Sequence, residues 1–296
     1  DVLWYYTSST CLYLKKTWSL PAAAPIDPTT FKGVMGSGYD SVNNSTYPNM
    51  IIFNPVDGTY TLKSIGNAST YYLRHQAFAD SVIFQTNAKE YFPDNLADLG
   101  LQADLHGRIW FWDRNQDSFF VGIDATAKAG HPQPIYYPPA VSGYKKGTET
   151  YDLYVFASGT YYEHDTDITG PQVGDNNKFE PSIFIAVSKP WGTSAVSSSN
   201  ILRIPIKTLT YKDENGQTQT VGKRTQVTTS PILLIPTNDS SSPQAVFSIY
   251  DPDTLDCAGT SYIVIIKINI DSNGEISATT SGYSAGTGAV SGFAVM

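Results

Sequence analysis

The chain has 296 residues, a formal net charge of −8 and a sequence pI of about 4.9. Hydrophobic residues make up 41% of it and charged residues 16%, so a packed core is expected and a disordered chain is not. Nucleic-acid binding normally needs a basic surface, which this acidic chain lacks, and no apolar run approaches the roughly 18 residues of a transmembrane helix.

Short runs of β-branched and aromatic residues, bounded by turn residues, recur along the whole chain and predict an all-β protein. Residues 50–53 and 59–62 flank Asp57-Gly58, a hairpin signal because such turns need a positive φ. Three further hairpins are expected at residues 102–111, 208–219 and 266–274, and residues 262–270 are expected to form a buried strand.

Two segments of the chain are also similar to each other in sequence. The segment 34–40 is similar to 155–161, and each is followed by a polar stretch and then a strand. Repeated modules of a few strands are typical of propeller blades, whereas a β-sandwich would explain the strands but not their repeated order. We therefore predict a single β-propeller domain over residues 1–296, a partial ring of about four blades modified by long inter-strand loops. The predicted blades lie near residues 19–66, 76–126, 134–208 and 229–280.

Five segments carry a family resemblance. They are Cys11 to Pro21 with its Trp18-Ser19, Gly36-Ser37-Gly38-Tyr39, Ala103 to Asp113 with an Asp-x-x-Gly turn, Ser158-Gly159, and Asp256 to Tyr262 with its Cys257. In their order these segments resemble the carboxy-terminal β-propeller of the PilY-type pilus-tip adhesins, the biogenesis and adhesion factors of type IV pili. Family members usually also have a large amino-terminal region, to which no segment of these 296 residues is expected to correspond.

The resemblance implies export through the periplasm and an extracellular position at the pilus tip or cell surface. It implies roles in adhesion and pilus assembly, with minor pilins or other pilus-tip proteins and a host or abiotic surface ligand as partners. Residues 2–6 and 289–295 look like strands of incomplete blades, which fits a piece of a larger propeller. The start at Asp1, with no leader before it, also fits a removed signal peptide.

A calcium site is the main candidate for a functional centre. The family often has an Asp-rich loop at this place, with carboxylates spaced to surround a hard cation. Here Glu90, Asp94 and Asp98 keep three of its positions, whereas Phe92 and Asn95 replace a ligand and the turn glycine. Two interpretations stay open, a weakened calcium site that modulates binding and a solvated loop that has lost its metal.

The two cysteines of the chain, Cys11 and Cys257, leave two alternatives open as well. They form either one disulfide that joins the two ends of the chain or two buried free thiols. A set of only two cysteines excludes a CxxC metal site and a dense disulfide scaffold.

Catalytic motifs are missing from the sequence: it contains no Gly-x-Ser-x-Gly elbow, no His-Glu-x-x-His pair and no phosphate-binding loop. A binding protein is therefore expected rather than an enzyme. The alternatives are a secreted propeller enzyme, such as a glycoside hydrolase or a quinoprotein dehydrogenase, and a structural subunit of a surface filament. His106 lies in a predicted hairpin turn and is expected to be exposed.

Two aromatic runs are candidates for a binding platform, Trp110-Phe111-Trp112 and Tyr136-Tyr137. Alternate residues of a strand face opposite sides, so Trp110 and Trp112 should share one face and Phe111 should occupy the other. One face is expected to be core, which leaves the other as the candidate platform.

Overall fold

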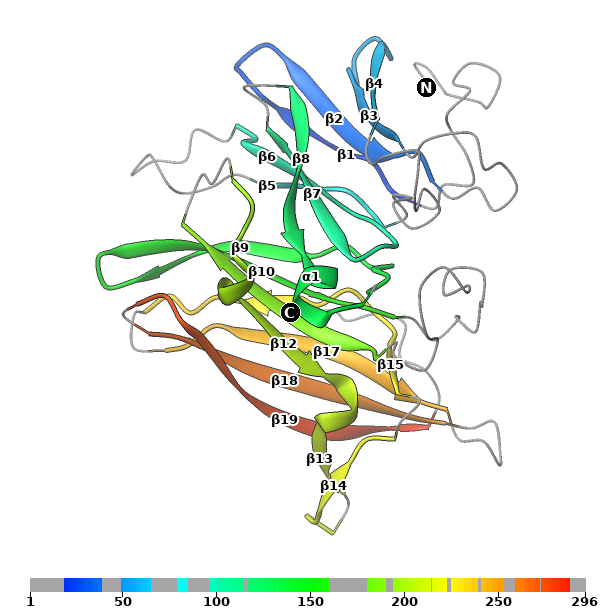
Figure 1. The fold of residues 1–296 in the computed structure, drawn as a ribbon, viewed down its shortest axis with the longest axis vertical. Helices are drawn as coiled ribbons and strands as arrows, with labels where there is room; N and C mark the ends of the chain where they lie inside the picture. Colours follow the sequence, from blue (N-terminus) through cyan, green and yellow to red (C-terminus); the bar gives the residue numbers. More distant parts are fainter. Residues whose placement is uncertain are drawn as a thin grey trace.

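In the computed structural model, the regular secondary structure of the described residues is almost all β-strand, as the sequence predicts (Figure 1). The structure describes residues 19–38, 49–64, 79–84, 96–113, 117–131, 133–159, 180–189, 194–213, 215–222, 225–238, 241–252, 259–271 and 273–287.

The first three sheets are antiparallel and have four strands each, in chain order. The first contains β1 (Ala22–Pro25), β2 (Phe31–Gly36), β3 (Asn49–Phe53) and β4 (Tyr60–Ser64). The second contains β5 (Val82–Phe84), β6 (Leu99–Ala103), β7 (Arg108–Asp113) and β8 (Ser118–Asp124), and is followed by the short helix α1 (Ala125–Ala129). The third contains β9 (Ala140–Lys146), β10 (Glu149–Ala157), β11 (Ser182–Ser188) and β12 (Ile201–Pro205), with the 3-10 turn η4 (Ser198–Asn200) before β12.

The fourth sheet is larger and begins after a second 3-10 turn, η5 (Ile206–Thr208). Its strands are β13 (Thr210–Lys212), β14 (Thr218–Thr220), β15 (Gln226–Val227), β16 (Ile232–Leu234), β17 (Gln244–Asp251), β18 (Thr260–Ile270) and β19 (Ile276–Thr287). The small β13–β14 hairpin joins this sheet through a parallel contact with β19. The blade boundaries and the single-domain assignment made from the sequence stay a prediction.

All four predicted hairpins are present. They join β3 to β4, β6 to β7, β13 to β14 and β18 to β19. Gly58, in the first of these turns, has the positive φ of 73° that the Asp-Gly pair predicted. The strand predicted over residues 262–270 is also confirmed, because it lies within β18, where buried and less buried residues alternate.

The sheets stack face to face, each on the next (Figure 1). Val34 and Ile52 of the first sheet pack on Trp112 of the second. On the opposite face of the second sheet, Phe111 stacks on Tyr154 of the third, with ring centroids 5.3 Å apart. The third core layer lies between the third and fourth sheets and contains buried residues such as Val155, Ile185, Phe247 and Val264. This succession of four sheets is the blade arrangement of a β-propeller, so the predicted fold class is confirmed.

The stacking overturns one aromatic prediction. Trp110, Phe111 and Trp112 alternate between the two faces of β7, as expected, but both faces are buried. Their exposed fractions are 8%, 1% and 0%. A blade with a neighbour on each side has no solvent-facing surface in its middle strands, so this run is structural and the binding platform predicted there was wrong. Tyr137, in the second run, is partly buried against the core between the third and fourth sheets.

No helix in the described ranges is long and apolar enough to cross a bilayer.

Candidate functional site

The self-similar segments occupy equivalent places in two blades. Ser37-Gly38 directly follows β2, and Ser158-Gly159 directly follows β10, the second strand of the first and third sheets respectively. Both serines are buried, and both glycines have a positive φ, of 88° at Gly38 and 84° at Gly159. The repetition seen in the sequence therefore corresponds to a repeated strand ending, at which the chain leaves the sheet through a left-handed glycine.

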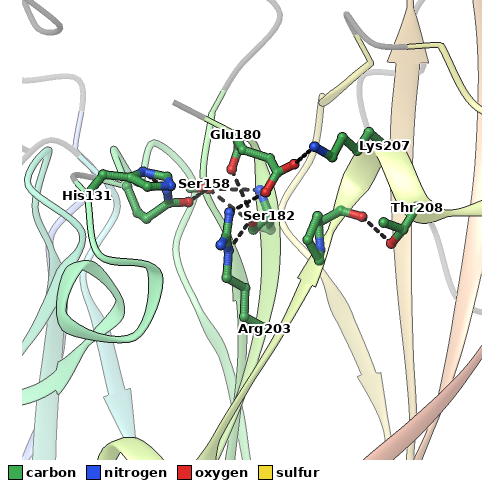
Figure 2. Close-up of polar contacts among 9 residues, drawn as sticks. His131, Ser158, Glu180, Ser182, Arg203, Lys207 and Thr208 are labelled. Carbon is green, nitrogen blue, oxygen red and sulfur yellow. Dashed lines mark hydrogen bonds and ion pairs between the residues drawn. The ribbon is translucent and has the colours of Figure 1, made fainter. Parts of the chain in front are cut away.

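Ser158 is the centre of a buried chain of hydrogen bonds (Figure 2). Its hydroxyl donates to Oε1 of Gln133 at 2.6 Å and accepts from the backbone N–H of Ser182 at 3.0 Å. Gln133 is fully buried, and its Nε2 lies 2.8 Å from Nδ1 of His131. These contacts connect the segment that follows α1 to the middle strands of the third sheet.

An ion-pair group adjoins this chain (Figure 2). Arg203 donates from Nη2 to Oε2 of Glu180 at 2.7 Å and from Nε to Oγ of Ser182 at 2.9 Å. Lys207 forms an ion pair with the other carboxylate oxygen, Oε1 of Glu180. The hydrogen bond from Lys207, together with the charge of Arg203, holds the pKa of Glu180 below its ordinary value of 4.5, so this side chain is a carboxylate at neutral pH.

We use the name Ser158 cluster for these residues together: Gln133, Ser158, Glu180, Ser182, Arg203 and Lys207. Their side chains come from the ends of β10 and β11, from the end of β12 with η5, and from the segment before β9. All of them therefore lie at one end of the third sheet.

A buried turn of the second sheet adjoins the cluster. Oδ1 of Asp104 accepts hydrogen bonds from the backbone N–H groups of residues 106, 107 and 108, at 2.9, 2.9 and 2.8 Å. Oδ2 accepts from the indole Nε1 of Trp110 at 2.8 Å. The Asp-x-x-Gly turn predicted before an aromatic strand is confirmed. Gly107 has a φ of 103°, as the turn requires.

His106 lies in this turn but is buried, with an exposed fraction of 9%, so the expectation of a surface histidine was wrong. The reason is that the segment 133–135 covers the turn. The N–H of Gln133 donates to O of His106 at 3.1 Å, and the N–H of Ile135 donates to O of Asp104 at 3.3 Å. Gly159 donates to O of Pro134 at 2.8 Å, so the same segment also contacts the strand end of the third sheet.

The hydrogen bonds indicate what the cluster can do. Ser158 and Ser182 are both fully buried, and their hydroxyls donate to an amide oxygen and to a backbone carbonyl. A serine nucleophile needs a neighbouring base and access to substrate, and neither hydroxyl has this arrangement. The bonds instead join Ser158-Gly159 to residues 180–182, the two chain segments on either side of residues 160–179. The arrangement therefore holds these two segments together at one end of the third sheet.

The predicted calcium ligands are only partly within the described residues. Glu90 and Asp94 lie outside them, as do Cys11 and Cys257. Asp98 directly precedes β6 and has an exposed fraction of 5%, so its carboxylate is largely removed from water. In the described ranges, no three or more His, Cys, Asp or Glu side chains are grouped so as to hold a metal ion. The calcium site and the disulfide stay predictions.

Sequence reasoning found part of the cluster and missed the rest. Ser158-Gly159 was identified through its similarity to Ser37-Gly38. Gln133 lies between two prolines in a stretch without a strand pattern, and Glu180 precedes Pro181 at the start of a strand. A charged residue next to a proline at a strand boundary is a weak signal, and the partner residues 203 and 207 are distant in sequence. Only the pairing of β11 with β12 brings these charges together.

No family model matches the chain, and no curated protein matches it either. Among solved structures, the C-terminal domain of Pseudomonas aeruginosa PilY1 is similar to this one, with a TM-score of 0.56. The alignment covers 95% of this chain and 69% of that one, at 13% sequence identity. The chain has the fold of the PilY1 C-terminal domain. The family resemblance inferred from five short segments is thus confirmed at the level of the fold, and the PilY1-like fold extends over nearly the whole chain.

Proposed function

We propose that this chain is a non-enzymatic adhesion and assembly domain at the tip of type IV pili. The observation that carries the proposal is the PilY1-like fold over 95% of the chain. The expected location is extracellular, after export through the periplasm. The expected partners are minor pilins or other pilus-tip proteins, with a host or abiotic surface as the ligand.

The Ser158 cluster supports binding through loops. Binding residues are commonly found on loops held by a rigid scaffold. The cluster fixes both chain segments that flank residues 160–179, and it does so with buried hydrogen bonds and a carboxylate paired to two cations. The sequence between these two segments contains several acidic residues, among them Glu163, Asp165 and Asp167, which would suit recognition of a basic surface.

The proposal is tested first in the cell. The gene for the protein would be deleted in its source organism, and surface pili would be counted by electron microscopy, with adhesion measured in parallel. We expect fewer pili and weaker adhesion, both restored by the wild-type gene. Normal piliation and normal adhesion in the deletion strain would refute a role at the pilus tip.

The role of the cluster is tested with a matched pair of variants. Lys207→Ala removes one cation from Glu180, whereas Lys189→Ala breaks the ion pair with Glu149 at the opposite end of the same sheet. Binding of the purified chain to minor-pilin ectodomains would be measured by biolayer interferometry. We expect Lys207→Ala to weaken binding and Lys189→Ala to leave it unchanged. Equal effects of the two variants would argue against binding at the cluster end.

The enzyme alternative can be examined with the same purified chain. Hydrolysis of glycosides, or oxidation of an alcohol coupled to a dye, would favour a secreted propeller enzyme. A convergent pair of carboxylates would be needed for the first of these activities.

We further propose that calcium bound by Glu90, Asp94 and Asp98 modulates binding. The proposal rests on residue type and spacing, since carboxylate oxygens are the ligands that calcium takes in proteins. Because Asp98→Ala would also disturb the core, the informative variant is the double substitution Glu90→Ala and Asp94→Ala. Calorimetry should detect calcium binding in the wild type and a loss of heat in this variant.

The control for the calcium experiment removes the same charge elsewhere. Asp57→Ala combined with Asp271→Ala eliminates two exposed carboxylates of hairpin turns. This control should bind calcium like the wild type. An absence of binding by the wild type would refute the calcium proposal and leave the pilus-tip proposal unaffected.

A further inference from the structure

The last strand of the fourth sheet has an open edge. β19 pairs with β18 along its whole length, from Ile276 to Thr287. On its other side it pairs with β13 at a single position, Tyr283 with Lys212. A Cβ atom at Gly282 would lie 2.6 Å from O of Thr210, so β13 occupies the space beside β19 at residues 282 and 283. No other strand in the described ranges pairs with residues 276–281.

Figure 1 shows the arrangement: β19 lies between β18 and the small β13–β14 hairpin, whose strands are much shorter than β19. Consecutive residues of an antiparallel strand direct their N–H and C=O groups alternately to the two sides. About half of the backbone groups of residues 276–281 are therefore directed away from β18. At about 3.4 Å per residue, this open edge is about 20 Å long.

The outer strands of the molecule are protected in ways that residues 276–281 of β19 are not. Natural sheets prevent edge-to-edge association with short strands, prolines, charged side chains or a covering segment. β5, β14 and β15 have three residues or fewer, and β8 is covered by a hydrogen bond of 2.7 Å from the N–H of Val196 to O of Gly122. The remaining outer strands carry Pro25 in β1, Lys63 in β4, Lys145 and Lys146 in β9, and Arg203 and Pro205 in β12.

Residues 276–281 have none of these protective features. Their sequence, Ile-Ser-Ala-Thr-Thr-Ser, contains no charge and no proline. Their register with β18 is regular, since the one shift in this pair lies at residues 261 and 262. The side chains of Ser277, Thr279 and Ser281 are exposed on one face, so that face of the edge is accessible. Such an edge is suited to receive another strand.

We propose that residues 276–281 bind an extended segment of another protein, which adds a strand to the fourth sheet. Main-chain hydrogen bonds would supply the affinity, and alternate side chains the specificity. The proposal depends on the geometry of this edge and is independent of the pilus-tip function.

The surroundings of the edge define the chemistry of the segment. On the inner face, Ile276 and Ala278 pack against the core between the third and fourth sheets, and Leu202 and Ile204 of β12 are partly buried against the same core. Apolar side chains of an added strand would extend this layer. On the outer face, an added strand would lie beside the hydroxyl groups of Ser277, Thr279 and Ser281. The expected partner is therefore an extended segment in which apolar residues alternate with uncharged polar ones.

A second copy of the chain is the less favourable occupant. Each copy carries a net charge of −8, so two copies repel one another, whereas an uncharged segment does not suffer this repulsion. A short segment also needs no space for a whole folded domain beside the β13–β14 hairpin.

The experiment uses the full 296-residue chain and a synthetic peptide in which valine and threonine alternate, with capped ends and a terminal pair of lysines for solubility. Hydrogen exchange would be followed with and without the peptide. We expect the peptide to slow exchange within residues 276–281 and to leave the covered edge strand β8 unchanged. A peptide that is N-methylated at alternate residues lacks the N–H donors along one of its two edges. Methylation of the peptide edge that pairs with β19 should weaken binding by a factor of about ten or more.

A charge swap tests the register. Thr279→Lys places a cation on the exposed face of the edge, and Thr220→Lys makes the same change on the exposed strand β14. Peptides with Glu or Lys at the central polar positions would be compared on both variants. We expect Thr279→Lys to bind the Glu peptide about fivefold more tightly than the Lys peptide, and Thr220→Lys to bind the two peptides equally. Thr279 is exposed, so this substitution leaves the core intact.

Three results would overturn the proposal. The first is unchanged exchange at residues 276–281 in the presence of saturating peptide. The second is equal binding of all N-methylated peptides, which would mean that main-chain pairing is not involved. The third is a dimer of the chain alone in sedimentation velocity, with residues 276–281 protected without peptide and released on dilution, since the occupant would then be a second copy.

Discussion

Two regions of the molecule contain the same turn in different surroundings. The turn that starts at Asp104 joins β6 to β7, and the turn that starts at Asp271 joins β18 to β19. In both, the Asp N–H donates to the carbonyl oxygen of the residue four positions later, at 2.9 and 3.0 Å. In both, Oδ1 accepts from the backbone N–H groups two and four positions later. A third copy starts at Asp213 and has the same bonds.

The two turns differ in the contacts that surround them. Asp271 is exposed, and the bonds of its turn are local. Asp104 is fully buried, its second oxygen accepts the indole N–H of Trp110, and the segment 133–135 covers the turn. The same four-residue motif therefore only closes a hairpin in the fourth sheet. In the second sheet it also contacts the segment 133–135, which leads to the third sheet. Its contribution to stability should differ between the two places accordingly.

The largest effect is expected for Asp104→Ala. This change leaves three backbone N–H groups and one indole N–H without their acceptor in a buried place, so it should lower the free energy of unfolding by about 3–5 kcal/mol. Asp104→Asn keeps one acceptor oxygen, although its amide nitrogen cannot accept from Trp110. It should therefore lower the free energy of unfolding by less than Asp104→Ala does. Urea unfolding followed by circular dichroism would measure both changes. A loss below about 1 kcal/mol for Asp104→Ala would refute the buried role of the turn.

Glycine substitutions sharpen the same comparison. A Cβ at Gly107 would lie 2.7 Å from the backbone O of Gln133, and the φ of 103° is unfavourable for any side chain. Gly107→Ala should therefore cost about 2–4 kcal/mol. At Gly216, in the Asp213 turn, the φ is 75° and nothing lies within 4 Å of such a Cβ. Gly216→Ala should cost only about 1 kcal/mol, the conformational part alone. Equal losses in thermal or urea unfolding would mean that the contact with Gln133 is unimportant.

A small effect is expected at the exposed turn. Asp271→Ala removes the hydrogen bonds to the N–H groups of Asn273 and Glu275, both of which water can replace. We expect the free energy of unfolding to fall by about 0.5–1 kcal/mol, measured against the wild type under the same conditions. A loss as large as that of Asp104→Ala would contradict the difference between the two turns.

These turns also show how far the sequence is informative. The Asp-x-x-Gly pattern predicts a hairpin because a side-chain acceptor and a left-handed glycine are local requirements. Nothing local distinguishes Asp104 from Asp271, since the distinction comes from segment 133–135, which lies nearly thirty residues further along the chain. The wrong expectation for His106 has the same origin. A turn is usually exposed, and only the packing of the next blade buries this one.

The fold and the candidate site differ in the same way. Strands and hairpins are set by alternation and turn residues over a few positions, and the stacking of blades follows from apolar side chains on both faces, as in Trp110 and Phe111. The Ser158 cluster combines residues from four separate segments, and its ion pairs depend on the register between β11 and β12. Single-sequence reasoning has no access to such a register, so it finds Ser158-Gly159 and misses Glu180.

The smallest effect on stability is expected from the ionisation of Asp213, which is accessible to solvent. The side-chain hydrogen bond from Gln219, followed by the backbone N–H groups of Gln217 and Asn215, holds the pKa of Asp213 below its ordinary value of 3.8. The unfolded chain therefore binds the proton more readily than the folded chain. The stabilisation by this carboxylate is present above the unfolded pKa and is lost as pH falls through the folded pKa.

A carboxyl NMR titration would measure this shift directly. Gln219→Ala removes its leading cause and should raise the pKa of Asp213 toward 3.8. The stability difference between the wild type and Asp213→Asn should also shrink as pH is lowered through this range, because the protonated aspartate resembles asparagine in charge. An unchanged pKa in Gln219→Ala would assign the shift to the backbone donors alone. The motif itself, without burial, would then account for the ionisation of its aspartate.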